Sequence, residues 1–75
     1  MAKTPIREVR IEGEPIRLGQ FLKLAGLAEH GGQAKALLEA DEVTVNGRPE
    51  RRRGAQLRAG DVVAVGGERA RPVSG

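Results

Sequence analysis

A chain of 75 residues with no cysteine and a net charge of +3 predicts one small domain, residues 1–75, with a thin core. Neither disulfides nor a thiolate metal site can stabilise it. Its apolar runs are too short to span a membrane, and its N-terminus lacks the apolar segment of a signal peptide, so we expect a cytoplasmic protein. Residues 1–45 carry six basic and seven acidic side chains, whereas residues 46–75 carry seven and three. This asymmetry favours a basic face and a polyanionic partner.

The first half of the chain predicts one strand and then a helix. Residues 6–11 place three aliphatic residues among charges, which is typical of a short edge strand. A helix is predicted where apolar residues recur at i, i+3, i+4 and i+7, at Leu18, Phe21, Leu22 and Ala25. Gly26 follows as a left-handed C-terminal cap, and Leu27 can pack back onto the helix end.

A second helix is predicted over residues 33–40, with its inner face formed by Ala34, Leu37 and Leu38. Gly31 or Gly32 is the expected N-cap. The short connection predicts a helical hairpin or a right-angled helix pair.

The second half of the chain predicts short strands joined by turns. Residues 43–45 form a strand, and Asn46-Gly47 is a favoured type I′ hairpin turn. Pro49 makes the returning segment irregular or places it at an edge. Leu57 is expected in the core, residues 62–65 are the main core strand, and residues 68–73 form a last short strand.

Pro72 indicates that this last strand is peripheral. The elements together predict an α+β fold with two short helices packed on a small, mostly antiparallel β-sheet.

Catalytic chemistry is poorly represented in the sequence. The single histidine, His30, lies in a Gly-flanked loop, and the only serine is Ser74. No Ser-His pair, Cys-His pair or phosphate-binding loop is present, so we expect neither an enzyme nor a cofactor. The adjacent carboxylates of Asp41 and Glu42 leave one acid/base hypothesis open.

Basic residues accumulate in one segment, opposed within it by Glu50 alone; they are Arg48, Arg51, Arg52, Arg53 and Arg58. Arginine forks bind phosphate oxygens and release counterions. Lys23 and Lys35, on the polar sides of the helices, extend this set.

The chain has one aromatic residue, Phe21, which the helical spacing assigns to the core. A platform for stacking single-stranded bases is therefore missing, which favours duplex or folded RNA read through backbone and shape. Two other interpretations stay open for the arginine segment: a solvated loop, or a protein-interaction module that binds an acidic partner.

The order of four segments resembles the RNA-binding domain named after small-subunit ribosomal protein S4, and above all its small stand-alone bacterial members. The segments are residues 16–23, 31–38, 41–47 and 57–63, and the likeness covers about residues 16–66. Its strongest parts are Val-x-Val-Asn-Gly and the later Gly-Asp-x-Val. The resemblance implies an S4-like αL RNA-binding fold and a structured RNA partner, ribosomal or transfer RNA, with association to the ribosome or its precursors. With Arg58 added from the basic segment, the expected RNA-binding residues are Lys23, Gln33, Lys35, Arg48, Arg51, Arg52, Arg53 and Arg58.

Overall fold

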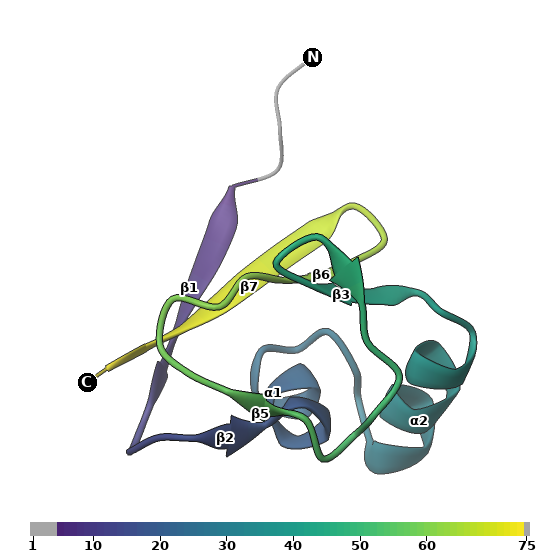
Figure 1. The fold of residues 1–75 in the computed structure, drawn as a ribbon, viewed down its shortest axis with the longest axis horizontal. Helices are drawn as coiled ribbons and strands as arrows, with labels where there is room; N and C mark the ends of the chain where they lie inside the picture. The colour runs from purple at the N-terminus through teal and green to yellow at the C-terminus, as the bar shows by residue number, and fades with distance from the viewer. Residues whose placement is uncertain (1–4, 75) are drawn as a thin grey trace.

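Two helices lie on one side of a five-stranded sheet in the computed structural model, which describes residues 5–74 (Figure 1). The helices are α1 (Leu18–Leu24) and α2 (Gly31–Glu39). The strands are β1 (Ile6–Ile11), β2 (Ile16–Arg17), β3 (Val43–Val45), β4 (Arg48–Pro49), β5 (Gln56–Leu57), β6 (Val63–Val65) and β7 (Glu68–Ser74). Neither helix in this range is long and apolar enough to cross a membrane.

The sheet is mostly antiparallel and its strand order is β1-β7-β6-β3-β4. Strand β6 lies in the middle and pairs antiparallel with β3 and β7. Strand β1 forms one edge and pairs parallel with β7. A separate two-stranded ribbon, β2-β5, lies beside α1 (Figure 1). The α+β class, the edge position of residues 6–11 and the central position of the 62–65 segment are thus confirmed.

The core lies between the helices and the sheet. The apolar face predicted for the first helix is buried, and Phe21 is fully inaccessible at its centre. Leu38 of α2, Val43 and Val63 of the sheet, and Leu57 of the ribbon complete this core. Each element is too short to fold alone, so burial against the others supplies most of its stability.

The end of α1 follows the sequence prediction. Gly26 has a φ of +75°, the left-handed region that favours glycine. The amide of Leu27 donates to the carbonyl of Leu22 at 2.9 Å, and the Leu27 side chain is buried. The turn therefore directs the chain back under the helix.

The start of α2 differs from the prediction, which placed the N-cap at Gly31 or Gly32. The helix begins at Gly31, and the N-cap is His30, whose Nδ1 accepts a hydrogen bond from the Gln33 amide at 3.1 Å. A histidine ring nitrogen can satisfy an open amide of the first turn as a Ser or Asp oxygen does. Glycine has no side-chain acceptor with which to compete.

The hairpin between β3 and β4 is the type I′ turn that the sequence predicts. Asn46 and Gly47 have φ values of +52° and +83°, as both central residues of such a turn require. Strand β4 has only two residues, includes Pro49 and lies at the edge of the sheet, as expected.

The last strand is longer and more central than predicted. Strand β7 runs through Ser74 and lies between β1 and β6, and Pro72 is buried within it. Strand β6 pairs only as far as Ala70, and the Pro72 carbonyl instead accepts from the Gly60 amide at 2.9 Å. The side of Pro72 without a donor thus faces a loop, so the proline removes no hydrogen bond from the β1-β7 ladder.

Candidate nucleic-acid interface

The loop that connects β4 to β5 is attached to the start of α1. Helix α1 has no side-chain N-cap. Its first amides donate instead to loop carbonyls: Leu18 to Ala55 at 2.8 Å and Gly19 to Arg53 at 2.9 Å. A Cβ on Gly19 would lie 3.4 Å from the Arg53 Cβ, so the loop backbone runs close against the helix. Since the loop carbonyls cap α1, the position of Arg53 depends on the helix.

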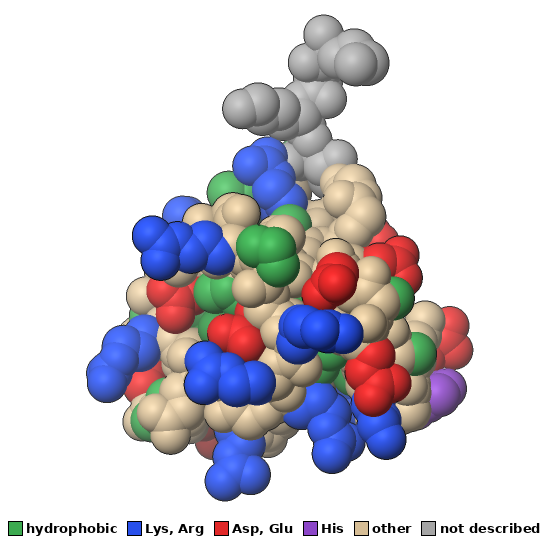
Figure 2. Space-filling view, turned by 45° about the vertical axis from the view of Figure 1, so that its right-hand side comes forward, with side chains coloured by type: hydrophobic (Ala, Val, Ile, Leu, Met, Phe, Trp, Pro, Cys, Tyr) green, Lys and Arg blue, Asp and Glu red, His purple; other side chains and the backbone are tan. Residues whose placement is uncertain are grey.

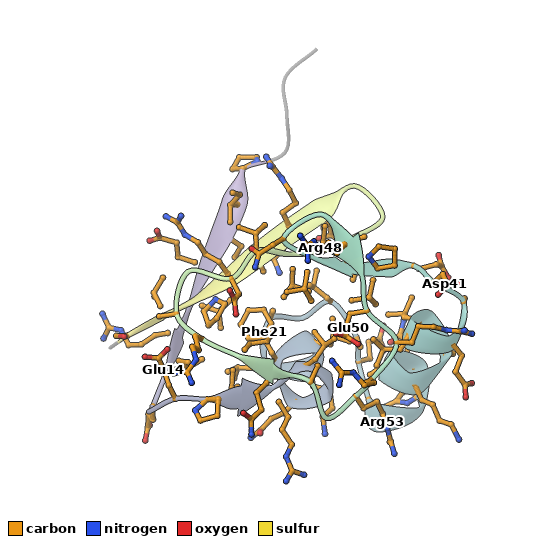
Figure 3. All side chains as sticks on the ribbon, in the orientation of Figure 1. Glu14, Phe21, Asp41, Arg48, Glu50 and Arg53 are labelled. Carbon is orange, nitrogen blue, oxygen red and sulfur yellow. The ribbon has the colours of Figure 1, made fainter. Side chains whose placement is uncertain are left out.

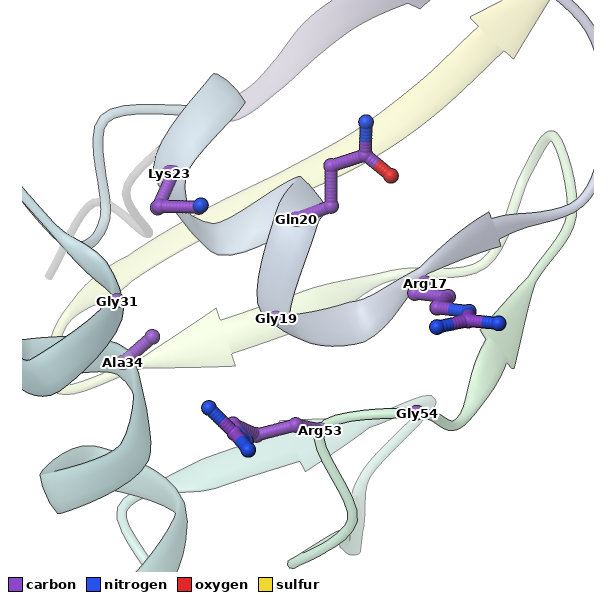
Figure 4. Close-up of a pocket in the computed structure, with 8 residues that line it drawn as sticks. All are labelled: Arg17, Gly19, Gln20, Lys23, Gly31, Ala34, Arg53 and Gly54. Atoms are coloured by element: carbon purple, nitrogen blue, oxygen red, sulfur yellow. The ribbon is translucent and has the colours of Figure 1, made fainter.

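An open groove of about 720 Å³ lies between this loop and the two helices (Figure 4). Its lining residues are Arg17, Gly19, Gln20, Lys23, Gly31, Ala34, Arg53 and Gly54. Three of these side chains are cationic and none is a carboxylate, so the lining is purely positive in formal charge. Three of the lining residues are glycines, which add no side chains to the groove.

The three cations of this groove, Arg17, Lys23 and Arg53, are exposed, and none has a side-chain hydrogen bond or ion pair to another residue of the 5–74 range. They come from three places in the chain: the residue before α1, the polar side of α1, and the β4-β5 loop. Gly31, the first residue of α2, adds the positive end of that helix dipole to the same groove. We call Arg17, Lys23 and Arg53 the groove cations.

Two neighbouring arginines are already engaged by carboxylates. Arg51 pairs with Asp41 at 3.2 Å and donates to the Glu39 carbonyl at 3.2 Å. Arg52 binds Glu50 with two contacts, Nε to Oε2 at 3.1 Å and Nη2 to Oε1 at 3.3 Å. The sequence predicts Glu50 as an opposing charge, but Asp41 comes close to Arg51 only in the fold.

Glu50 is unusual among the acidic residues because four donors converge on it. Besides the Arg52 side chain, the amides of Arg51 and Arg52 both donate to its Oε2 at 3.1 Å. The side-chain and backbone hydrogen bonds from Arg52 hold the pKa of Glu50 below its usual value of 4.5. Glu50 is therefore a carboxylate at neutral pH.

The S4 domain model matches residues 9–71, which is most of the chain. This chain belongs to the S4 domain family. It is 51% identical over 59 residues to the probable ribosome maturation protein RlbA of Bacillus subtilis strain 168, covering 79% of this chain and 83% of that protein. It also resembles the solution structure of YbcJ from E. coli, described as revealing an αL motif involved in RNA-binding. That match has a TM-score of 0.70 and 28% identity, and covers 97% of this chain and 94% of YbcJ.

The S4 domain brings only part of the predicted RNA-binding set into the groove. Lys23 and Arg53 line it, whereas Arg48 lies on β4, well apart from Arg53 (Figure 3). The basic segment is therefore not a single array around the Asn46-Gly47 turn, because the chain leaves that turn and crosses to α1 before Arg53. Lys35 and Arg58 are exposed outside the groove lining.

Gln33 has a structural task in this S4 domain. Its side-chain Oε1 accepts from the Glu29 amide at 2.6 Å, while its own amide donates to His30. These two contacts resemble a capping box at the start of α2. A role for Gln33 in RNA binding stays a prediction.

Arg17 and Gln20 are groove residues that the sequence reasoning did not identify. Gln20 precedes Lys23 by three residues, so helical periodicity places both on one side of α1, and this signal could have found it. Arg17 stands just before the helix, where periodicity says nothing. Its place in the groove depends on the β2-β5 ribbon, in which it pairs with Gln56.

Charges of both signs are interspersed on the face shown in Figure 2, where carboxylates lie among Lys and Arg side chains. Basic side chains do not form one uniform patch on that face. The groove that contains the groove cations is distinguished because no carboxylate lines it.

The acid/base hypothesis for Asp41 and Glu42 receives no support from the geometry. The Asp41 side chain is 58% exposed and pairs with Arg51. Within the described range, no group of three or more His, Cys, Asp or Glu side chains could hold a metal ion. Asp41 is better explained as the partner of Arg51.

Proposed function

We propose that this chain is a non-enzymatic, cytoplasmic RNA-binding module that recognises structured RNA, ribosomal or transfer RNA, through backbone and shape contacts. Membership of the S4 family supports this proposal, as does the likeness to a probable ribosome maturation protein and to YbcJ. We further propose that the RNA is part of the ribosome or one of its precursors, and that residues 16–66 form the binding core of a single domain spanning 1–75.

The observation that carries the proposal is a groove lined by three cations and no carboxylate, with no side-chain partner for any of the three within residues 5–74. A phosphate placed there meets guanidinium and ammonium donors that have no partner in the described part of the chain to give up. Arg51 and Arg52 would have to exchange an internal carboxylate for phosphate, so their net gain is smaller. Arg17, Lys23 and Arg53 are therefore the principal phosphate contacts, and Lys35, Arg48 and Arg58 are outer contacts reached by a larger RNA.

Recognition of shape follows from the absence of an exposed Phe, Tyr or Trp ring in the described residues. Phe21 is the only aromatic residue of the chain, and it is buried in the core. Bases of a flexible single strand thus find no aromatic platform, and phosphates held at fixed spacing by a folded RNA become the recognised feature.

A salt titration tests the proposal. Binding of a folded transfer RNA and of a folded ribosomal RNA fragment is compared with that of an unstructured oligonucleotide of equal length. If three to five phosphates are neutralised, log affinity falls against log salt with a slope of roughly −2 to −4. The folded RNAs should bind more tightly than the oligonucleotide.

An acidic protein partner is the alternative outcome of the same experiment. Failure of both folded RNAs to bind at low salt would contradict the RNA proposal and favour the protein-interaction module. Binding of the unstructured strand as tightly as the folded RNAs would contradict shape recognition while leaving RNA binding intact.

A further inference from the structure

Glu50 is an acidic residue inside the segment proposed to bind a polyanion, and simple electrostatics predicts that it weakens binding. Its side chain is only 22% exposed, whereas the Arg52 side chain that it binds is 80% exposed. The carboxylate therefore lies on the inner side of the loop, and the arginine projects into solvent. This arrangement suits a group that acts on the loop rather than one that faces the RNA.

The contacts of Glu50 organise the backbone immediately before Arg53. Its Oε2 accepts from two successive amides, those of Arg51 and Arg52, and its own amide donates to the Val43 carbonyl at 3.1 Å. The chain next forms a tight turn in which the Ala55 amide donates to the Arg52 carbonyl at 3.2 Å. Glu50 thus fixes the first residues of the β4-β5 loop beside strand β3.

The exit of the loop is held by α1. The Arg53 and Ala55 carbonyls accept from the first two amides of that helix. Arg53, whose side chain has no internal partner in the described range, lies between these two anchors and borders the groove (Figures 3 and 4). Because an arginine on an already ordered backbone loses less conformational entropy on binding, loss of either anchor should reduce the contribution of Arg53.

We propose that Glu50 is a positioning residue for RNA binding: it orders residues 50–53 so that Arg53 faces the groove, and it strengthens binding despite its negative charge. This inference rests on the proposed RNA-binding function. The repulsion between Glu50 and a bound phosphate is reduced because Arg52 neutralises the carboxylate, and because exposed charges are screened over about 10 Å at 0.1 M salt.

Substitutions at Glu50 distinguish repulsion of the RNA from positioning of Arg53. If repulsion dominates, removing the charge strengthens RNA binding, and if positioning dominates, removing it weakens RNA binding. Glu50→Ala removes both acceptor oxygens and should weaken binding of a folded transfer RNA about three- to tenfold, the loss of roughly one positioned phosphate contact. Glu50→Gln keeps one oxygen for the loop amides and should weaken binding less, by about twofold. The salt slope of Glu50→Ala should be less steep than that of the wild-type chain by about one.

A double-mutant cycle with Arg53→Ala shows whether Glu50 acts through Arg53. In the Arg53→Ala background, Glu50→Ala should change affinity by less than about twofold, because the contact that it positions is already gone. Glu29→Gln removes the same charge from an exposed side chain outside the loop and serves as the matched control. Circular dichroism melts set a temperature at which every variant is folded, so weaker binding cannot arise from unfolding.

The outcomes separate the inference from the function on which it rests. If the wild-type chain binds RNA and Glu50→Ala binds equally or more tightly, Glu50 is a competitor of phosphate and the inference is wrong. An undiminished effect of Glu50→Ala in the Arg53→Ala background would also overturn it. If the wild-type chain binds no folded RNA at low salt, the proposed function itself fails and the inference with it.

Discussion

The side chain of Asn46 is joined to that of Asp61, with Asn46 Nδ2 donating to Asp61 Oδ1 at 3.0 Å. The two residues lie fifteen positions apart and belong to the two strongest sequence motifs of the chain. Asn46 Oδ1 accepts from the Val62 amide at 2.9 Å, and Asp61 Oδ2 accepts from the Arg58 amide at 2.8 Å. The motifs thus join the turn after β3 to the turn before β6, which gives both of them a structural role.

Asn46→Ala should destabilise the domain by about 1–3 kcal/mol. The change removes both side-chain hydrogen bonds and places a residue with a Cβ but no local acceptor at a φ of +52°. Urea unfolding monitored by circular dichroism measures the loss. Asn46→Gly, which relieves the backbone strain but not the lost contacts, should recover part of it. Equal stability of Asn46→Ala and the wild-type chain would contradict this account of the motif.

Two glycines at the ends of α1 should respond to alanine in opposite directions. Gly19 has an ordinary helical conformation, and the added Cβ would reach only van der Waals distance from Arg53. Gly19→Ala should therefore be neutral or stabilise by up to about 1 kcal/mol. Gly26 has a φ of +75°, and Gly26→Ala should destabilise by about 1–2 kcal/mol. Thermal unfolding of both variants side by side tests the difference, and the same sign for both would contradict it.

Arg53→Ala should weaken binding of folded RNA more than Arg52→Ala does. Arg53 lines the groove without a side-chain partner among residues 5–74, whereas Arg52 is bound by Glu50. We expect about a three- to tenfold loss for Arg53→Ala, with the salt slope reduced by about one, and less than about twofold for Arg52→Ala. Fluorescence anisotropy at several salt concentrations measures both quantities.

Arg10→Ala is the matched control for these two arginine variants. It removes an exposed arginine of β1 that does not line the groove. A loss for Arg10→Ala as large as that for Arg53→Ala would show that net charge, and not the groove, governs binding.

The contribution of Glu50 to stability should disappear in acid. Its pKa is lowered in the folded chain, chiefly by hydrogen bonds from Arg52, so the folded state binds the proton less readily than the unfolded state. The stabilisation is fully present above the usual value of 4.5 and is lost as pH falls through the lower folded-state pKa. The difference in melting temperature between the wild-type chain and Glu50→Gln should therefore shrink as pH falls below that value. A constant difference across this range would show that the carboxylate charge does not stabilise the loop.

Local patterns in the sequence predict much of this fold. The spacing of Leu18, Phe21 and Leu22 predicts the buried face of α1, because helix periodicity is a property of neighbouring residues. Asn46-Gly47 predicts the hairpin, because few residue pairs tolerate two positive φ values. The order of the motifs identifies the family that the S4 domain match confirms.

Features that depend on distant residues were out of reach of such patterns. In the sequence, Pro72 indicates a peripheral strand. In the structure, β6 pairs with β7 only as far as Ala70, so the side of Pro72 that lacks an amide hydrogen faces a loop and not a strand. The His30 cap is a local contact, three residues from Gln33, but it depends on α2 beginning at Gly31, which the sequence pattern does not fix. Most consequentially, a run of three arginines in sequence separates into two that bind carboxylates and one, Arg53, with no side-chain partner in the described part of the chain. Ion pairs and capping contacts form between residues that the folded backbone brings together, so the place of Arg53 beside the groove is decided by the packing of its loop on α1.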